Sequence, residues 1–372
     1  MMPYDLNIAF LGSGRCFHTF DWFRSSELLL DHRVPFITDN YESDGHPSLF
    51  RKGDDARELL IIDRILSPTA SIIGHKWRNL VKFLVIPLQI LLLRRHLERL
   101  GNPFVLAHST YYAFLASFTS VRYAAVPQGS EVLVRPNSHL YRWLLRRSVL
   151  KAQFVTVDSE AMRTVLREFT DRPIFIIQNG INVRAVQSVK DGPRDKVMSI
   201  RAISANYRIL EIIAGRNDAA PDVRLTLTSP FSEAAYLELV DRAVSSEDRM
   251  LGCVEKSELY ALMAQAICVF SIPNSDSSPR SVYEAIFAGA AIALAPAQFI
   301  HALPACMRER AIEVDISEQG WFSKALERAQ TITSKPYTPS EEALDAFDQV
   351  KSMGRCLDLV KQFIISPAIN VR

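Results

Sequence analysis

The sequence contains few cysteines, and their distribution argues against two kinds of stabilising site. The five cysteines are an odd number, lie far apart and form no Cys-x-x-Cys pair. Such spacing indicates neither a disulfide framework nor a structural zinc site. We therefore expect a protein of a reducing compartment, the cytoplasm.

Long apolar runs, export signals and repeats are also missing. No apolar stretch reaches the roughly 20 residues that a membrane-spanning helix requires. A short apolar run at 8–11 leads directly into glycines, without a basic segment before it, so we expect no export signal. The net charge of +2 argues against nucleic acid as a main partner.

The length of the chain predicts two domains, and the net charge differs between its two halves. At 372 residues and 48% hydrophobic content, the chain is long enough for two domains. Residues 1–180 carry 22 Lys and Arg against 17 Asp and Glu, whereas the remainder carries 21 against 24. A basic first half favours an anionic surface or ligand.

The first half reads as a repeated βα pattern, which predicts a parallel sheet. Gly12 and Gly14 follow the first apolar run, and a glycine turn there lets backbone approach a ligand. His18 could contact a substrate or simply end a helix. We expect strands at 7–11, 34–38, 104–107, 124–127, 154–157 and 174–177, with a helix at 17–30.

Two further features of the first half have alternative interpretations. Gln128 and Glu131 follow a strand and are candidates for ligand contact in the same crevice as Gly12, although Gly129 between them also fits an ordinary turn. Residues 76–99 hold six basic residues around the apolar run 83–93. This run, in which Leu88, Leu91 and Leu92 share a face, fits a core helix or a helix on an anionic membrane surface. A second basic patch, without an acid between its members, comprises Arg135, Arg142, Arg146, Arg147 and Lys151.

The second half repeats the α/β pattern after a polar linker at 188–196. We expect strands at 197–203, 223–228, 267–272, 291–295 and 312–314, helices at 207–214, 231–244 and 256–266, and a long helix at 340–364. The expected domains are 1–185 and 186–345, with a C-terminal helix at about 345–372 packing back on the first domain.

Residues 269–296 read as strand, loop, helix and strand. Ligands of open α/β sheets bind beyond the carboxyl ends of strands, so the loop at 273–280 is the natural place for a site. Asp276 and Glu284 bracket this loop with seven residues between them. In an alternative interpretation, Ser281 to Glu284 is a capping box, in which Glu284 only satisfies a backbone N–H.

With these residues, the sequence resembles the GT-B glycosyltransferases, in particular the retaining family four. Asp276 and Glu284 match its acidic-x7-Glu motif, Pro279 lies at its expected place, and 284–289 match its Glu-Ala-x-x-x-Gly. Further matches are Gly12, Gly129–Glu131, Asp158–Met162, Asn179–Asn182, Arg201 and Gly252.

The resemblance implies two Rossmann-like domains that face a central cleft, and a nucleotide-sugar site on the second domain. Arg201 would hold the departing diphosphate, and Glu284 the ribose hydroxyls. The family's Lys position holds Tyr207 or Arg208, of which Arg208 could replace the Lys. Asp276 would lie near the sugar. Other donor-side residues would be Gly12, Pro279 and the backbone N–H groups of Arg280, Ser281 and Val282.

The resemblance also implies how the reaction proceeds. The leaving phosphate would help to deprotonate the acceptor, Gln128 would hold a hydroxyl where the family often has His, and His18 and Glu131 would lie on the acceptor side. No Asp-x-Asp occurs, so we expect no metal cofactor.

The leading hypothesis is thus a retaining glycosyltransferase that transfers a sugar from a nucleoside-diphosphate sugar to a glycan or lipid-linked acceptor in cell-surface polysaccharide biosynthesis, at the cytoplasmic membrane face. The alternatives are a nucleotide-sugar epimerase or hydrolase, and a catalytically silent GT-B module that binds a sugar nucleotide or a partner enzyme.

Overall fold

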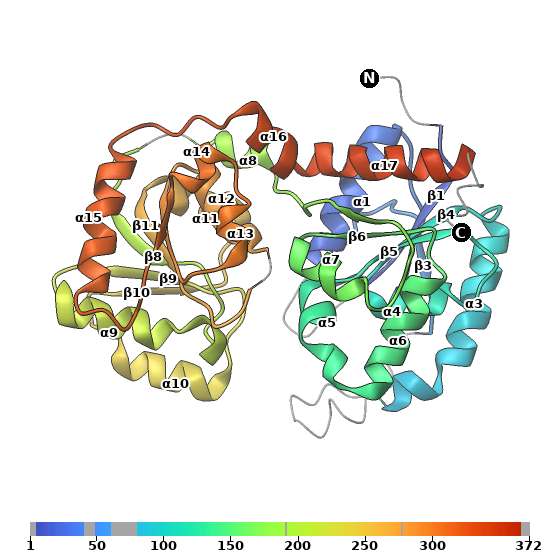
Figure 1. Ribbon diagram of the computed structural model, residues 1–372, viewed down its shortest axis with the longest axis horizontal. Coiled ribbons are helices and arrows are strands. Elements are labelled where there is room, and N and C mark those ends of the chain that lie inside the picture. Colours follow the sequence, from blue (N-terminus) through green and yellow to red (C-terminus); the bar gives the residue numbers. More distant parts are fainter. Residues whose placement is uncertain (1–4, 41–48, 61–79, 190–191, 277, 366–372) are drawn as a thin grey trace. The chain divides into compact units, whose positions relative to one another are not determined.

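A computed structural model of the chain describes residues 5–40, 49–60, 80–189, 192–276 and 278–365 (Figure 1). The chain forms two compact units. Unit 1 comprises Met1–Asn179 and Gln349–Arg372, and unit 2 comprises Gly180–Asp348. Parts of the expected loop at 41–53 and of the linker at 188–196, the basic residues Lys76 and Arg78, and Ser277 lie outside the described residues.

Unit 1 is built on a parallel sheet of seven strands in the order β3-β2-β1-β4-β5-β6-β7. The order reverses between β1 and β4, which is the topological switch point of a Rossmann-like sheet. The strands are β1 (Ile8–Leu11), β2 (Phe36–Thr38), β3 (Ala56–Glu58), β4 (Phe104–His108), β5 (Tyr123–Val126), β6 (Phe154–Val157) and β7 (Ile174–Ile176).

Side chains alternate between two hydrophobic cores, one on each face of this sheet. In β4, Phe104 and Leu106 belong to one core, and Val105 and Ala107 to the other. Burial on both faces explains why the strands read as continuous apolar runs. The helices are α1 (Phe17–Leu30), α3 (Ile86–Arg99), α4 (Thr110–Ala116), α5 (Gly129–Leu133), η2 (Arg135–Asn137), α6 (His139–Leu150), α7 (Glu160–Leu166) and α17 (Gln349–Ile365).

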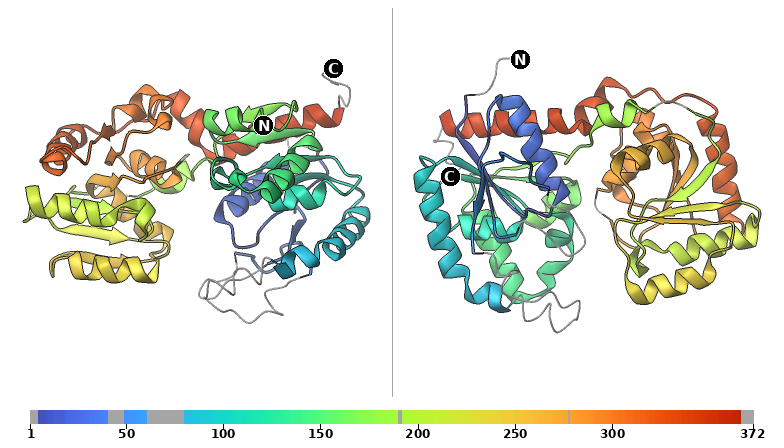
Figure 2. Two further views of the ribbon diagram at one scale, coloured as in Figure 1. Left: turned by 60° about the horizontal axis from the view of Figure 1, so that its bottom comes forward. Right: turned by 180° about the vertical axis from the view of Figure 1, so that it is seen from behind.

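Helix α17 lies alongside α1, although the two are far apart in the sequence (Figure 2, where α17 is red and α1 blue). Met353, Cys356, Leu357 and Val360 are buried at helical spacing in the core that also contains Phe23 of α1. The end of the described chain therefore completes unit 1.

Helix α3 differs from the expected core helix in the face that it buries. Leu88 and Leu91, which lie on the face that a core helix would bury, are 45% and 44% exposed. Gln89, Leu93 and Leu97 are buried instead. Pro87 occupies the first turn, where its missing N–H costs nothing. The helix is thus apolar on the side toward solvent as well as toward the core.

Unit 2 is a second parallel sheet, of six strands in the order β10-β9-β8-β11-β12-β13, with its switch point between β8 and β11. Its strands are β8 (Lys196–Ser199), β9 (Leu225–Thr228), β10 (Arg249–Gly252), β11 (Ala266–Ser271), β12 (Ala291–Leu294) and β13 (Ala311–Glu313). Its helices are α8 (Val183–Gln187), η3 (Ala205–Tyr207), α9 (Ile209–Ala219), α10 (Ala234–Ala243), α11 (Lys256–Ala264), α12 (Arg280–Phe287), α13 (Gln298–His301), α14 (Ala305–Arg308), α15 (Trp321–Thr333) and α16 (Glu341–Phe347).

The structure corrects several expected elements. Strand β8 ends at Ser199 rather than at residue 203, so Arg201 lies in the loop beyond the sheet. The long helix expected at 340–364 is two helices, because the backbone of Asp348 is extended. Among the described residues, no helix is long and apolar enough to cross a membrane.

Candidate functional site

The candidate donor site lies at the switch point of the sheet of unit 2. Strands β8 and β11 are parallel neighbours, with Met198 opposite Val269. Parallel strands end at the same edge, so the segments that follow them meet there. Arg201 follows β8 and Asp276 follows β11, and this arrangement brings a cation and a carboxylate together.

Arg201 is the centre of a compact polar group. Its side chain forms an ion pair with Asp276, and its Nη1 donates a hydrogen bond of 2.7 Å to Ser281 Oγ. The guanidinium carbon lies 4.4 Å from the centre of the Tyr207 ring, a cation–π distance. Arg201 is only 8% exposed, so these contacts fix the orientation of its charge.

Hydrogen bonds between two loops hold this group in place. The backbone N–H of Asn274 donates to the carbonyl of Asn206 at 2.8 Å. The amide of Asn206 donates to Ser275 O, and the amide of Asn274 donates to Ala205 O, both at 3.3 Å. The loop that carries Asp276 is thereby joined to η3, which carries Tyr207.

Arg208, the expected substitute for the family's Lys, has a left-handed backbone with φ of 51° at the start of α9. This conformation is uncommon for a residue with a side chain and is often found at functional sites. Among the described residues, its side chain has no ion-pair partner. Its guanidinium therefore carries a charge that a ligand could neutralise.

Helix α12 begins at Arg280 with Pro279 as its N-cap residue. The N–H of Val282, an expected diphosphate donor, donates to the carbonyl of Pro279 at 2.9 Å and is thus already engaged. Ser281 is bonded to Arg201 through its side chain. The candidate anion site therefore loses the Val282 N–H as a donor and keeps Arg201 beside the start of α12.

The alternative in which Glu284 caps its own helix is wrong, because α12 has no side-chain cap. Glu284 is 3% exposed, and its carboxylate instead contacts α11. Lys256 Nζ lies 2.6 Å and Tyr260 Oη 3.0 Å from Glu284 Oε1. Ser281 and Glu284 are three residues apart on α12, so Glu284 lies on the same face as the Arg201 group.

Unit 1 has a smaller polar group at its own switch point. A Cβ on Gly12 would lie 2.7 Å from Thr19 Cγ2 and 3.4 Å from His108 Cβ, so only glycine fits. The atoms that lie close to the backbone of Gly12 thus belong to Thr19 and His108. Thr19 Oγ1 lies 2.8 Å from His108 Nδ1. Burial, and secondly the charge of His18, lower the pKa of His108 to about 3, so its imidazole is neutral.

The acceptor-side candidates of unit 1 have structural partners. Glu131 Oε2 accepts hydrogen bonds from the backbone N–H groups of Gln128 and Thr110, at 3.0 and 2.8 Å. These contacts cap the starts of α5 and α4. Gln128 Nε2 lies 3.3 Å from Cys16 Sγ. His18, in the first turn of α1, is partly exposed.

Three site residues were not identified from the sequence. His108 directly follows the expected strand 104–107, and a polar residue at the carboxyl end of a strand is a usable signal. Lys256 begins a helix shortly after β10 and offers the same signal. Tyr260 offers no such sequence signal, because a tyrosine among Leu, Ala and Met is typical of a core helix.

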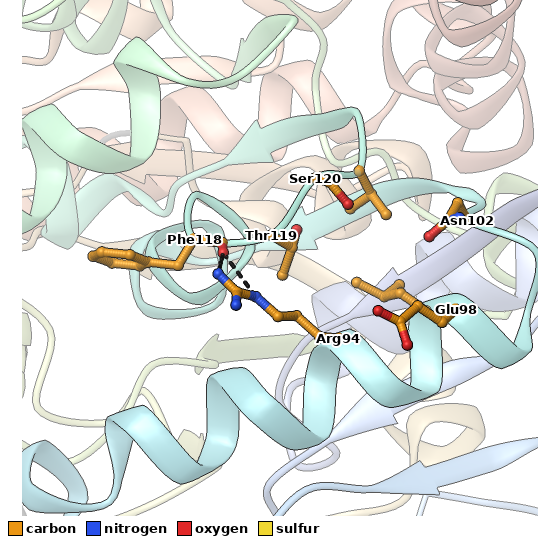
Figure 3. Close-up of a pocket in the computed structure, with 8 residues that line it drawn as sticks. Arg94, Glu98, Asn102, Phe118, Thr119 and Ser120 are labelled. Atoms are coloured by element: carbon orange, nitrogen blue, oxygen red, sulfur yellow. Dashed lines mark hydrogen bonds between the residues drawn. The ribbon is translucent and has the colours of Figure 1, made fainter.

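Two further observations concern metal binding and a pocket in unit 1. Within the described ranges, no group of three or more His, Cys, Asp and Glu side chains is placed to hold a metal ion. A pocket of about 390 Å³ lies in unit 1 between α3 and the segment before β5, where Arg94 Nε donates to Phe118 O at 3.1 Å (Figure 3). Because α3 ends and β5 begins there, this pocket lies at the amino edge of the sheet, away from Gly12.

Comparison with known proteins identifies the fold. Neither a family model nor a curated sequence matches the chain. Sucrose-phosphate synthase from Thermosynechococcus elongatus is 13% identical and superposes with a TM-score of 0.73, covering 96% of this chain and 99% of that one. HepE from Anabaena, in complex with UDP-glucose, is 14% identical with a TM-score of 0.69, covering 95% and 99%. The pneumococcal O-GlcNAc transferase GtfA, in complex with UDP and GlcNAc, is 13% identical with a TM-score of 0.53, covering 73% and 60%.

At these identities the likeness concerns the fold, and with sucrose-phosphate synthase and HepE it extends over nearly the whole chain. The two sheets, their strand orders and the superpositions confirm the expected fold of two Rossmann-like domains. The protein therefore has the GT-B fold of the glycosyltransferases.

Proposed function

We propose that the protein is a glycosyltransferase that transfers a sugar, with retention, from a nucleoside-diphosphate sugar to a glycan or lipid-linked acceptor. One observation carries the proposal. A nearly buried Arg201 is bonded to Ser281 in the first turn of α12, and a buried Glu284 follows on the same helix. HepE, which shares the fold, has been crystallised with UDP-glucose, and this supports the donor class.

In this proposal Arg201 and the first turn of α12 hold the diphosphate. Negative charge grows on the diphosphate as the glycosidic bond breaks, and a fixed guanidinium beside a helix N-terminus stabilises it. Arg208 supplies a second cation. Phosphate oxygens would replace Asp276 on Arg201, and the released carboxylate would then accept hydrogen bonds from the sugar. Glu284 binds the ribose.

The proposal assigns the acceptor to unit 1. Gln128 would hold a hydroxyl group of the acceptor, with His18 and Glu131 nearby. The leaving phosphate would take the proton of that hydroxyl group. Rate enhancement then comes mostly from positioning and charge stabilisation. No metal cofactor is included, because the sequence has no Asp-x-Asp for one.

We also place the protein at the cytoplasmic face of a membrane. Leu88 and Leu91 of α3 and Trp143 of α6 are 44 to 51% exposed. Both helices pack on α4. Between Glu131 and Asp158 the chain carries five basic residues and no acid. An apolar surface with basic flanks suits an anionic lipid surface. We further propose a role in cell-surface polysaccharide biosynthesis, which the family resemblance and the basic residues of unit 1 support.

The donor site can be tested by titration calorimetry with UDP, GDP and ADP. We expect Arg201→Ala and Glu284→Ala each to weaken binding of the preferred nucleotide about 10- to 100-fold, because each removes hydrogen bonds that involve a charged group. Arg224→Ala, which removes an arginine that is 73% exposed in the same unit, should change nothing. Equal affinity of both site variants and the parent protein would refute the assignment.

Product analysis separates the proposed reaction from its alternatives. A transferase consumes its nucleotide sugar efficiently only when an acceptor is present, whereas an epimerase or hydrolase turns over the donor alone. A protein that binds the nucleotide but consumes no donor under either condition would be a silent binding module.

A further inference from the structure

Glu284 is held by two donors that come from one turn of α11. Lys256 and Tyr260 are four residues apart, so their side chains lie on the same face of that helix. Lys256 Nζ lies 2.6 Å and Tyr260 Oη 3.0 Å from the carboxylate, and Lys256 Nζ lies 3.4 Å from Tyr260 Oη. The three side chains thus form a closed network.

Both donors reach the same oxygen of Glu284, Oε1. A carboxylate accepts hydrogen bonds at two oxygens. Among the described residues, Oε2 has no hydrogen-bond partner. Anchoring one oxygen fixes the plane of the carboxylate and leaves the other available in a defined direction.

The two donors differ in how firmly they hold the carboxylate. Tyr260 is 4% exposed, and its ring is packed in the core of unit 2, so the packing restricts the position of its hydroxyl. The side chain of Lys256 is 50% exposed, so solvent and salt weaken its attraction. Tyr260 is therefore the principal orienting group, and Lys256 adds charge.

We propose that Tyr260 and Lys256 are positioning residues that present Glu284 Oε2 to the ribose hydroxyls and so make the site selective for ribonucleotides over 2′-deoxyribonucleotides. The inference rests on the proposed function, because it requires Glu284 to bind the ribose. The inference adds that Tyr260 and Lys256, and not Glu284 alone, determine the orientation of the Glu284 carboxylate.

The test compares the dissociation constants of the preferred nucleoside diphosphate, chosen among UDP, GDP and ADP, and of its 2′-deoxy counterpart, by calorimetry. We expect Tyr260→Phe to reduce the ratio of the 2′-deoxynucleotide dissociation constant to the ribonucleotide dissociation constant about 3- to 10-fold. The main cause would be weaker binding of the ribonucleotide. Lys256→Met should reduce the ratio less, and its effect should shrink at high salt.

Matched controls separate positioning from general destabilisation. Tyr123→Phe removes a buried hydroxyl that donates to Ser148 O in unit 1, and Lys324→Met breaks an exposed ion pair with Glu318. Neither should change the ratio. If Tyr260→Phe does not fold, Lys256→Met carries the test, because that side chain is half exposed.

The outcomes distinguish the inference from the function on which it rests. If Glu284→Gln abolishes the discrimination but Tyr260→Phe and Lys256→Met leave it intact, the positioning role is wrong. Equal weakening of both nucleotides by Tyr260→Phe would indicate a structural role and would also overturn it. If Glu284→Gln leaves the discrimination unchanged, the ribose assignment itself fails.

Discussion

Arg216 and Asp248 form an ion pair that is almost completely shielded from solvent in unit 2, with side chains 1% and 0% exposed. The guanidinium donates two parallel hydrogen bonds of 2.8 and 2.7 Å to the carboxylate. Asp248 also accepts the backbone N–H groups of Leu225 and Ser245, both at 2.8 Å. The pair thus joins α9, β9 and the segment before β10.

We predict that Asp248→Asn lowers the free energy of unfolding by about 3–5 kcal/mol, because it leaves a buried guanidinium without its counter-charge. Urea denaturation of the two proteins measures this difference. Glu247→Gln is the matched control, because Glu247 pairs with Arg224 at the surface, where its side chain is 63% exposed. The control should cost less than about 1 kcal/mol. Similar losses in both variants would contradict the prediction.

The same pair makes stability depend on pH in a defined direction. Burial alone would raise the pKa of Asp248, but the hydrogen bonds from Arg216, Leu225 and Ser245 outweigh it and hold the pKa below its ordinary value of 3.8. A carboxyl with a lowered pKa in the folded state stabilises the protein above its ordinary pKa. This contribution is lost as the pH falls below about 3.8, and Asp248→Asn should remove that part of the acid dependence.

At the scale of residues, the sequence identified Asp276, Glu284 and Arg201 of the candidate donor site, but neither the pairing of Arg201 with Asp276 nor the partners of Glu284. Asp276 and Glu284 stand out because they bracket a loop between two apolar runs. Their partners cannot be read in this way, since Arg201 pairs with a residue 75 positions away and Lys256 with one 28 positions away. Such pairings depend on strand order, which the pattern of apolar runs does not specify.

At the scale of elements, α17 is the helix whose sequence position and structural position differ most. Its buried face contributes Met353 and Leu357 to the core around α1. Because α17 follows all of unit 2 in the chain, unit 1 is built from two separate segments.

We predict that Leu357→Ala destabilises unit 1 by about 2–5 kcal/mol through the cavity that it leaves in a fully buried site. Hydrogen exchange reports on each unit separately. Amides of β1 should exchange faster in the variant, whereas amides of β11 should be unchanged. Gln362→Ala, at an exposed position of the same helix, is the control. Faster exchange throughout both sheets would contradict an effect confined to unit 1.

Elements that are strongly apolar or regularly periodic were predictable, and polar or edge elements were not. The helix at 17–30 has the bounds that the sequence indicates. Strand β3 was missed because Ala56, Arg57 and Glu58 form a short, partly exposed edge strand without an apolar pattern. The break between α16 and α17 was missed because Asp348 lies within a continuous helical pattern.

At the scale of the whole molecule, the two units carry opposite charge. Unit 1 contains 26 Lys and Arg against 18 Asp and Glu, whereas unit 2 contains 17 against 23. The basic unit also exposes the apolar side chains of α3 and α6. Attraction to an anionic membrane would therefore act mainly on unit 1.

We predict that the protein floats with vesicles of phosphatidylcholine and phosphatidylglycerol but not with phosphatidylcholine alone. Arg142→Glu with Arg146→Glu should abolish flotation, and Leu88→Ser with Leu91→Ser should weaken it. Arg147 is left intact, because its side chain donates to Ser117 at 3.2 and 3.3 Å and is structural.

Leu28→Ser is the control for the apolar residues, since Leu28 is 69% exposed on α1 of the same unit. It should float like the parent protein. Flotation that survives the arginine substitutions at physiological salt would show that these helices do not bind the membrane.

The division of unit 1 into two chain segments has a consequence for biosynthesis. Residues 180–348 are made between the two segments, which takes roughly 10–30 s at common elongation rates. During that time α1 and the first sheet lack the helix that covers their core, while unit 2 is contiguous and can fold at once. The apolar face around Phe20, Phe23 and Leu30 is then open to chaperones or to other nascent chains until α17 leaves the ribosome.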